Sequence, residues 1–237
     1  MLNTNTIKVT LNGTEVSGHP GMTILELAQE NEIDIPTLCH YPGLPPIGAC
    51  RICVVEVEGS RTLVASCHTP IAPDMVIHTH SPKVLEARKV IVELLLASHP
   101  EACFVCDKGS LCELRKIAAD LEIGLPRFKV KKRYYPLDDL SPYIIRDLTK
   151  CILCQRCVRA CREIKKANLF AVAYRGFHSK VVVDQDQPLD KQACQSCDVC
   201  ISLCPVGALA KRDGENASQE TEATMSRVSG FDTEGVV

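Results

Sequence analysis

The sequence contains no tryptophan, and aromatic residues make up only 4% of its 237 residues. The chain therefore has few of the large aromatic side chains that would fill one large hydrophobic core. We expect small domains that depend on bound metal for stability. A G-x-G-x-x-G fingerprint after a strand is also missing, so we expect no nucleotide or flavin site in this chain. The formal net charge of −2 gives no general reason to expect nucleic-acid binding.

Export and membrane signals are missing as well. Residues 1–6 contain neither the positive cluster nor the apolar core of a signal peptide. The longest apolar run, residues 90–97, is interrupted by Glu93 and is too short to cross a bilayer. We therefore expect a cytoplasmic protein that does not insert directly into a membrane.

Cysteine, in contrast, is abundant. The chain has 15, an odd number that fits a disulfide framework poorly and favours thiolate ligands. Eight of them form two copies of the spacing C-x-x-C-x-x-C-x-x-x-C, 43 positions apart. This spacing is typical of proteins with two 4Fe–4S clusters, in which the fourth cysteine of each run serves the other cluster. The predicted ligand sets are Cys151, Cys154, Cys157 and Cys204 for one cluster, and Cys161, Cys194, Cys197 and Cys200 for the other. Zinc-type sites in an interaction scaffold are the alternative.

Four further cysteines lie in the N-terminal part with the spacing C-x10-C-x2-C-x13-C, namely Cys39, Cys50, Cys53 and Cys67. Four thiolates complete a 2Fe–2S cluster, and the small residues of segment 45–49 suit a loop whose backbone N–H groups approach the cluster sulfurs. A structural zinc site is the alternative, although such sites usually show two close C-x2-C pairs and only one occurs here.

Local patterns predict the elements that surround these cysteines. Three hairpins are expected, at residues 7–11 with 14–16, 53–57 with 62–65, and 169–174 with 180–183. The dipeptide Asn12-Gly13 in the first hairpin favours a type I′ turn. Thr23 and Glu26 form a capping box, which predicts that a helix follows.

Two more helices are expected in the middle of the chain. The first begins with Ser81 as N-cap and Pro82 at the first helical position, and Pro100 ends it. Its predicted buried stripe is Val84, Ala87, Ile91, Leu94 and Leu95. The second helix, stopped by Gly124 and Pro126, contains Leu111, Leu114, Ile117, Ala118 and Leu121.

Three cysteines remain between these helices, Cys103, Cys106 and Cys112, at C-x2-C-x5-C. A 4Fe–4S cluster there needs a fourth ligand. His99 lies four residues before Cys103, and the following proline biases it towards an extended conformation that could present the ring. Asp107, a water molecule or a residue of a partner compete for this position. We interpret the other histidines as surface or hydrogen-bonded residues: His19, His40, His68, His78, His80 and His178.

Two charged segments complete the chain. Residues 127–133 hold five basic residues in seven, which we interpret as a solvated strand or linker face. Docking to an acidic patch of a partner is one alternative, and nucleic-acid binding is another, for which no signature is present. Residues 213–237 hold six acidic residues and one basic residue, so we expect a flexible acidic tail.

Three motifs resemble a known group of proteins. Residues 35–40 read IPTLCH, residues 48–53 read GACRIC, and residues 99–106 read HPEACFVC. They resemble the large iron–sulfur subunit of respiratory complex I, the iron-only hydrogenases and the diaphorase small subunit of NAD-reducing hydrogenases, of which the last is most similar in length. The resemblance covers residues 1–212. It implies a β-grasp fold near the N-terminus and His99 as the fourth ligand beside Cys103, Cys106 and Cys112.

These features predict an α+β protein of three domains and a tail. A β-grasp 2Fe–2S ferredoxin domain is expected at 1–80. A small helical domain, whose 4Fe–4S site has one histidine and three cysteine ligands, is expected at 81–136. A bacterial-type ferredoxin domain with two 4Fe–4S clusters is expected at 137–212, and the flexible tail at 213–237.

One 2Fe–2S and three 4Fe–4S clusters would use every cysteine, which leaves none for a substrate-activating metal centre. We therefore expect a non-catalytic electron-transfer subunit. The resemblance implies a hetero-oligomer with an FMN-containing, NADH-binding flavoprotein subunit and a second catalytic subunit, such as a hydrogenase or a formate dehydrogenase. The alternative is a free-standing polyferredoxin-like carrier or an iron–sulfur sensor without a fixed partner.

Overall fold

A five-stranded sheet forms the N-terminal part of the molecule. The structure is a computed structural model that describes residues 6–189, 194 and 197–212. The strands are β1 (Ile7–Leu11), β2 (Thr14–Gly18), β3 (Val54–Val57), β4 (Val64–Ala65) and β5 (Val76–His78). Their order is β2-β1-β5-β3-β4. Since β5 pairs parallel to β1 and antiparallel to β3, it joins two hairpins into one sheet.

The first hairpin is confirmed, and its turn is tied into the sheet. Asn12 and Gly13 have φ angles of 51° and 86°, the positive values that a type I′ turn requires at both positions. The Asn12 side chain donates to Thr79 Oγ1 at 2.8 Å and accepts from the Thr79 backbone N–H at 2.8 Å. The turn is therefore fixed to the segment that follows β5.

Helix α1 (Ile24–Glu30) packs its apolar side against this sheet. The predicted capping box is confirmed, because Thr23 accepts from the Glu26 N–H and the Glu26 carboxylate accepts from the Thr23 N–H. The core beneath the helix consists of Val9, Leu11, Ile24, Leu25, Leu27, Ala28, Ile35, Cys53, Val55, Ala65, Cys67, Ile71 and Ile77. Two of the predicted cysteine ligands thus lie in the core of this lobe.

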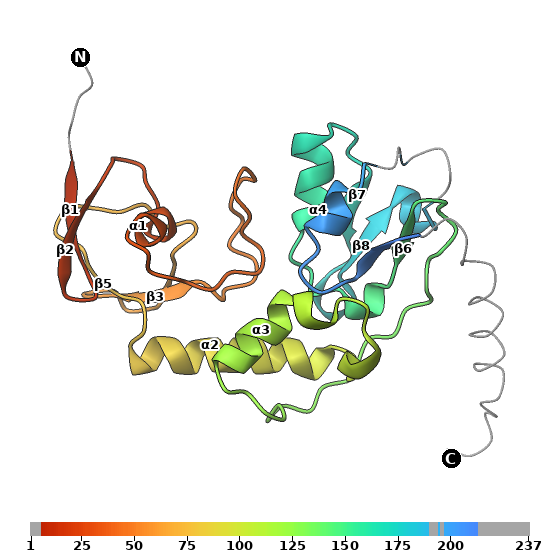
Figure 1. Ribbon diagram of the computed structural model, residues 1–237, viewed down its shortest axis with the longest axis horizontal. Coiled ribbons are helices and arrows are strands. Elements are labelled where there is room, and N and C mark those ends of the chain that lie inside the picture. The colour runs from red at the N-terminus through yellow and green to blue at the C-terminus, as the bar shows by residue number, and fades with distance from the viewer. Residues whose placement is uncertain (1–5, 190–193, 195–196, 213–237) are drawn as a thin grey trace.

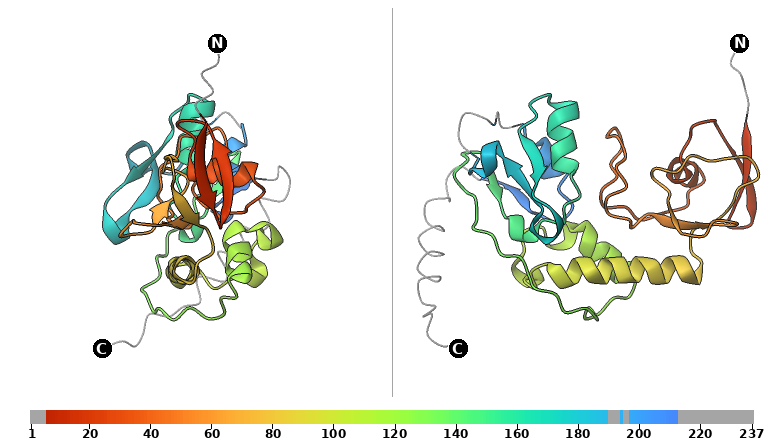
Figure 2. Two further views of the ribbon diagram at one scale, coloured as in Figure 1. Left: turned by 90° about the vertical axis from the view of Figure 1, so that its left-hand side faces the viewer. Right: turned by 180° about the vertical axis from the view of Figure 1, so that it is seen from behind.

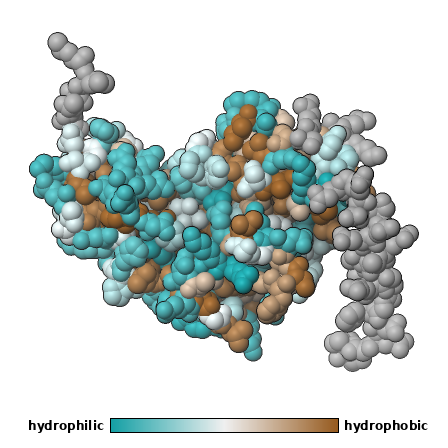
Figure 3. Space-filling view, in the orientation of Figure 1, coloured by the Kyte–Doolittle hydropathy of each residue, from teal (hydrophilic) through white to brown (hydrophobic). Residues whose placement is uncertain are grey.

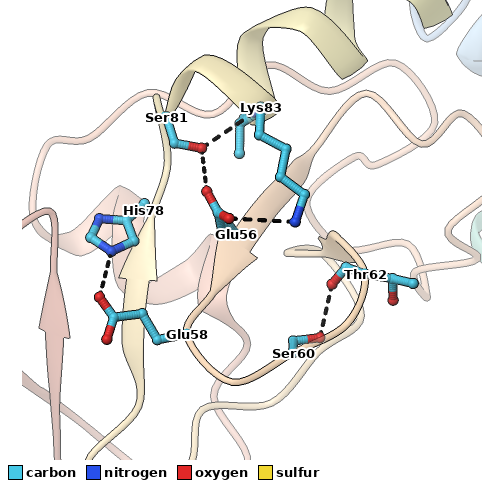
Figure 4. A network of polar contacts seen from close by, with 8 residues as sticks. Glu56, Glu58, Ser60, Thr62, His78, Ser81 and Lys83 are labelled. Atoms are coloured by element: carbon cyan, nitrogen blue, oxygen red, sulfur yellow. Dashed lines mark hydrogen bonds and ion pairs between the residues drawn. The ribbon is translucent and has the colours of Figure 1, made fainter.

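Helix α2 (Pro82–Ser98) begins as the sequence predicts. Ser81 is its N-cap and accepts from the Val84 N–H at 3.3 Å. As Figure 4 shows, the Ser81 hydroxyl also donates to Glu56 of β3 at 2.6 Å, and Lys83 lies within 3.4 Å of the same carboxylate. The start of the helix is therefore anchored to the sheet.

The predicted buried stripe of α2 is wrong in part. Leu94 is 45% exposed, whereas Arg88 and Glu93 are buried. Both polar residues have partners: Arg88 donates to the Val54 carbonyl at 2.9 Å, and Glu93 accepts from Arg127 at 2.6 Å. These partners lie far away in sequence, so helical periodicity alone could not reveal them.

Helix α3 (Glu113–Asp120) packs against α2 through Leu114, Ile117 and Ala118. Its predicted start is wrong, because Leu111 belongs to a separate 3₁₀ turn, Gly109–Leu111, and is 75% exposed. The basic residues 127–133 then form a linker without regular structure. Several of its charges pair inside the chain, since Lys132 reaches Glu101 at 2.5 Å and Arg133 donates to the Cys151 carbonyl.

Within the described residues, the C-terminal lobe contains two small sheets and two short α-helices. The predicted hairpin is confirmed as β7 (Phe170–Ala173) and β8 (Lys180–Val183). A second pair, β6 (Ile144–Arg146) with β9 (Leu209–Lys211), was not predicted. It joins the first and last described segments of the lobe's sequence. Helix α4 (Arg156–Arg159) continues into a π-helical turn, Ala160–Ile164, and α5 (Val199–Ser202) lies close to both.

The two lobes stand side by side on α2 and α3. Figure 1 and the reverse view in Figure 2 show α2 running beneath both lobes. The space-filling view in Figure 3 shows a notch between them on the edge opposite α2. None of the helices in the described residues has the length and hydrophobicity needed to cross a membrane. The predicted tail at 213–237 lies outside the described residues.

Candidate metal centres

The four N-terminal cysteines converge although they come from distant segments. Cys39, Cys53 and Cys67 are buried and Cys50 is half-buried. The Cys39 N–H donates to the Cys50 sulfur at 3.4 Å. The pKa of Cys39 is lowered because the thiols of Cys50 and Cys67 donate to its sulfur, and that same interaction raises the pKa of both neighbours. The Cys39 thiolate thus suppresses the ionisation of Cys50 and Cys67, so four thiolates require the positive charge of bound metal.

The second candidate site is a cavity at the end of α2, which we call the second cavity. It is lined by His99, Cys103, Cys106 and Cys112 together with Pro100, Ala102, Gly109, Arg115 and Lys150. His99 is the C-cap of α2 and has the extended backbone that the sequence predicts, with φ −84° and ψ 151°. The structure therefore brings the ring and the three thiols together.

The ring of His99 has one nitrogen available for a metal. Its Nδ1 lies 3.2 Å from the Pro100 carbonyl oxygen, whereas its Nε2 is buried and has no partner in the described residues. Burial lowers the pKa of His99, which favours the neutral ring. A neutral imidazole whose Nδ1–H donates to a carbonyl keeps its Nε2 lone pair for metal coordination. This donor set fits a 4Fe–4S cluster held by Nε2 and three thiolates.

The third candidate site is a cavity of about 440 Å³, including its open mouth, in the C-terminal lobe, which we call the third cavity. Its sulfur-bearing residues are Cys151, Cys154, Cys157 and Cys204. Apolar residues such as Phe170, Val181 and Leu209 complete the wall, as expected for covered clusters. Cys161 does not line this cavity although it directly continues the first run, so the chain brings the last cysteine of the second run here instead.

The thiols of the third cavity are hard to ionise without metal. Burial raises the pKa of Cys154 to about 12 and raises the pKa of Cys157 strongly. The Leu153 N–H donates to the Cys151 sulfur at 3.4 Å, the kind of contact that stabilises charge on a cluster ligand. Buried thiols at these positions fit ligands that become thiolates only when metal binds.

The remaining four cysteines are Cys161, Cys194, Cys197 and Cys200, which lie near enough to interact electrostatically. Burial raises the pKa of Cys200 to about 12, and the charges of Cys197, Cys194 and Cys161 add to the effect. The Leu169 N–H donates to the Cys161 sulfur at 3.4 Å. Residues 190–193 and 195–196 of this region lie outside the described residues, and the ligand role of these cysteines stays a prediction.

Direct contacts join the second and third cavities. The Glu113 N–H, next to Cys112, donates to the Pro205 carbonyl at 2.9 Å. The Glu113 carboxylate receives two hydrogen bonds from Arg156 at 2.6 and 2.8 Å. Gly207, with φ +68°, lies so close to Lys108 that a Cβ there would be 2.7 Å from the Lys108 Cβ. These contacts hold the two candidate cluster sites next to each other.

Sequence reasoning missed the basic residues around the cavities. Lys150 and Arg115 line the His99 cavity, and Arg133 donates to the Cys151 carbonyl. Their positive charges suit anionic clusters. The position of Lys150 directly before Cys151 was the one available signal.

Three family models match the chain one after another. Residues 4–82 match the 2Fe–2S iron–sulfur cluster binding domain. Residues 88–127 match the NADH-ubiquinone oxidoreductase-G iron–sulfur binding region. Residues 141–210 match the ferredoxin-like domain of NADH-quinone oxidoreductase subunit 3.

Curated relatives agree with these models. The chain is 38% identical over 213 residues to the NADP-reducing hydrogenase subunit HndD of Solidesulfovibrio fructosivorans, covering 87% of this chain and 36% of that protein. It is 39% identical over 205 residues to the second G subunit of NADH-quinone oxidoreductase from Rhizobium meliloti, covering 86% of this chain and 24% of that protein. The chain therefore spans only a fraction of the length of these relatives.

A solved structure shows the same fold. A chain in the crystal structure of an NAD+-reducing [NiFe]-hydrogenase in the H2-reduced state matches with a TM-score of 0.81 and 29% identity, and the match covers 87% of each chain. The chain is thus a mixed α/β protein built from 2Fe–2S and 4Fe–4S domains, and its predicted resemblance to the iron–sulfur subunits of NAD-linked hydrogenases and of NADH-quinone oxidoreductase is confirmed.

Proposed function

We propose that this chain is an electron-transfer subunit that relays single electrons through one 2Fe–2S and three 4Fe–4S clusters. In this assignment Cys39, Cys50, Cys53 and Cys67 hold the 2Fe–2S cluster. The 4Fe–4S ligand sets are His99, Cys103, Cys106 and Cys112; Cys151, Cys154, Cys157 and Cys204; and Cys161, Cys194, Cys197 and Cys200. Bound clusters supply the one-electron chemistry, and the protein holds them at fixed positions and covers them with apolar residues.

The proposal is supported most directly by the third cavity, which gathers cysteines from both ends of the C-terminal lobe. Cys204 lies there beside Cys151, Cys154 and Cys157, the crosswise arrangement of two-cluster ferredoxins. The orphaned Nε2 of His99 is the second support, because a buried nitrogen without a hydrogen bond is costly unless something binds it.

The contacts also suggest an order for the relay. The His99 site adjoins the Cys151 site through Glu113, Arg156 and Pro205. The loop that carries Cys39 touches α4, which carries Cys157, because Arg159 donates to the Pro45 carbonyl. Leu44 of this loop also packs against Ala160, which directly follows α4, and against Leu203. We therefore place the Cys151 cluster between the 2Fe–2S cluster and the His99 cluster.

The partners in this proposal are an FMN-containing flavoprotein that exchanges electrons with NAD(H) and a second catalytic subunit, such as a hydrogenase or a formate dehydrogenase. The relatives' names include an NADP-reducing hydrogenase subunit and NADH-quinone oxidoreductase subunits, which supports an NAD-linked hetero-oligomer. We place the domain boundaries at 80, 136 and 212, with a β-grasp fold in the first domain.

Co-purification from the native cells tests the partners. The chain, tagged at its C-terminus and isolated without oxygen, is expected to elute with a flavoprotein, and its visible absorption should bleach when NADH is added to the complex. A monomeric chain that elutes without any flavoprotein and is not bleached by NADH would contradict the proposal and support a free-standing carrier or sensor.

A further inference from the structure

We infer that Arg159 is a positioning residue that docks the Cys39 loop onto the C-terminal lobe and places a positive charge between two cluster sites. The inference rests on the proposed function, since it assumes that Cys39 and Cys157 are ligands. No sequence motif points to Arg159, which stands between Cys157 and Cys161 in the second half of α4.

The Arg159 side chain holds two carbonyl groups of the Cys39 loop at once. This side chain is buried, with only 2% of the residue exposed. Nη1 donates to the Pro45 carbonyl at 2.6 Å, and Nη2 donates to the Cys39 carbonyl. Both acceptors belong to the loop between Cys39 and Cys50. A rigid guanidinium fork can hold two carbonyls at once, which a lysine ammonium does less well.

Further contacts between the loop and the C-terminal lobe surround the Arg159 hydrogen bonds. Figures 1 and 2 show the segment that follows α1 reaching from the N-terminal lobe towards α4. Leu44 of the loop is buried against Ala160 and Leu203. The Arg156 guanidinium lies 5.6 Å from the centre of the Tyr41 ring. The Arg159 side chain thus forms the hydrogen bonds to the main chain of the loop. Apolar and aromatic contacts complete the interface.

The charge of Arg159 has no carboxylate partner in the described residues. Its neighbour Arg156 is paired with Glu113, whereas Arg159 forms no ion pair within 4.0 Å in that part of the chain. A buried cation without a counter-charge is strongly unfavourable. The cysteines whose charge would act on Arg159 are Cys39, Cys154 and Cys157, and the nearby positive charge is that of Arg156. Clusters bound by four thiolates are anionic, so they would be the counter-charges that make the buried guanidinium acceptable.

Two consequences follow for electron transfer. With clusters bound, the distance between the 2Fe–2S site and the Cys151 site would depend on how firmly Arg159 docks the Cys39 loop. A fixed positive charge also favours the more negative, reduced form of each site, so it raises both reduction potentials. Arg159 therefore acts on position and on potential together.

The test compares three variants of the full chain with bound clusters. Arg159→Gln removes the charge and the fork, and Arg159→Lys keeps the charge but loses the fork. Arg162→Gln is the matched control, because Arg162 lies three residues further on, has a side chain that is 55% exposed and pairs only with Glu163 among the described residues. Iron analysis first establishes that each variant carries the wild-type cluster content.

Hydrogen exchange then measures the docking of the Cys39 loop, and redox titration measures the reduction potential. The Leu44 amide, which donates to the Tyr41 carbonyl at 3.1 Å, should exchange at least ~10-fold faster in both Arg159 variants, because lost hydrogen bonds to a charged group change an equilibrium by about that factor. EPR-monitored titration should show a lower potential of the 2Fe–2S signal in Arg159→Gln only. If Arg159→Gln loads its clusters poorly, the exchange rate in Arg159→Lys decides the docking role.

Wild-type exchange in Arg159→Lys, or an unchanged 2Fe–2S potential in a fully loaded Arg159→Gln, would overturn the inference. These failures differ from failure of the proposed function, in which the wild-type chain itself would lack iron or would elute without a flavoprotein.

Discussion

Replacing Gly207 by alanine tests the close approach between the His99 and Cys151 sites. An alanine Cβ would lie 2.7 Å from the Lys108 Cβ, and φ at this position is +68°. The left-handed backbone costs an alanine about 1–2 kcal/mol, and forcing a methyl group into occupied space costs about 1–3 kcal/mol more. Gly176 is a matched control, because its φ is +57° but nothing lies within 4 Å of its Cβ position.

The assay is the temperature at which the cluster-loaded chain loses its visible absorption at a fixed heating rate without oxygen. Since about 1 kcal/mol corresponds to roughly 2–4 °C in a chain of this size, Gly207→Ala should melt some 2–12 °C below Gly176→Ala. Adding Lys108→Gly removes the opposing Cβ and should restore part of the difference. Equal midpoints for the two alanine variants would refute the close approach and with it the adjacency of the two sites.

Three further predictions concern the ligands and their supports. His99→Ala should lower the iron content from roughly 14 to roughly 10 atoms per chain, whereas His99→Cys should keep the iron and lower the potential of that site, as iron analysis and redox titration would reveal. A double-mutant cycle of Glu113→Gln and Arg156→Gln should give a coupling of about 1–2 kcal/mol in unfolding experiments, because the pair is bidentate but the Glu113 side chain is 42% exposed. Removing iron with a chelator should speed amide exchange in residues 148–157, whose thiols line the third cavity.

Local chemistry was enough to predict the elements whose signals lie within a few residues. The Asn12-Gly13 turn, the Thr23 capping box and the Ser81 N-cap all form as expected. Strand β5 and the β6–β9 pair were not predicted, because their partners are far away in sequence and their own residues carry no turn or alternation signal. Long-range pairing therefore decides how the predicted hairpins assemble.

The candidate site shows the same division. Cysteine spacing alone predicted that Cys204 would join the Cys151 group, and the structure places them around one cavity. The orientation of His99, with Nδ1 near a carbonyl and Nε2 unpartnered, could not be read from a motif. Neither could the buried contacts of Arg88 and Arg159, since arginine usually lies on the surface and its burial depends on distant carbonyls.

The cluster inventory of the purified chain tests the central claim most directly. Iron, acid-labile sulfide and zinc are measured on protein prepared without oxygen, and a Mössbauer spectrum separates 2Fe–2S from 4Fe–4S iron. We predict roughly 14 iron and 14 sulfide per chain, no zinc, and about one-seventh of the iron in 2Fe–2S form. Zinc at these positions, or a fully assembled chain with fewer than four clusters, would contradict the account.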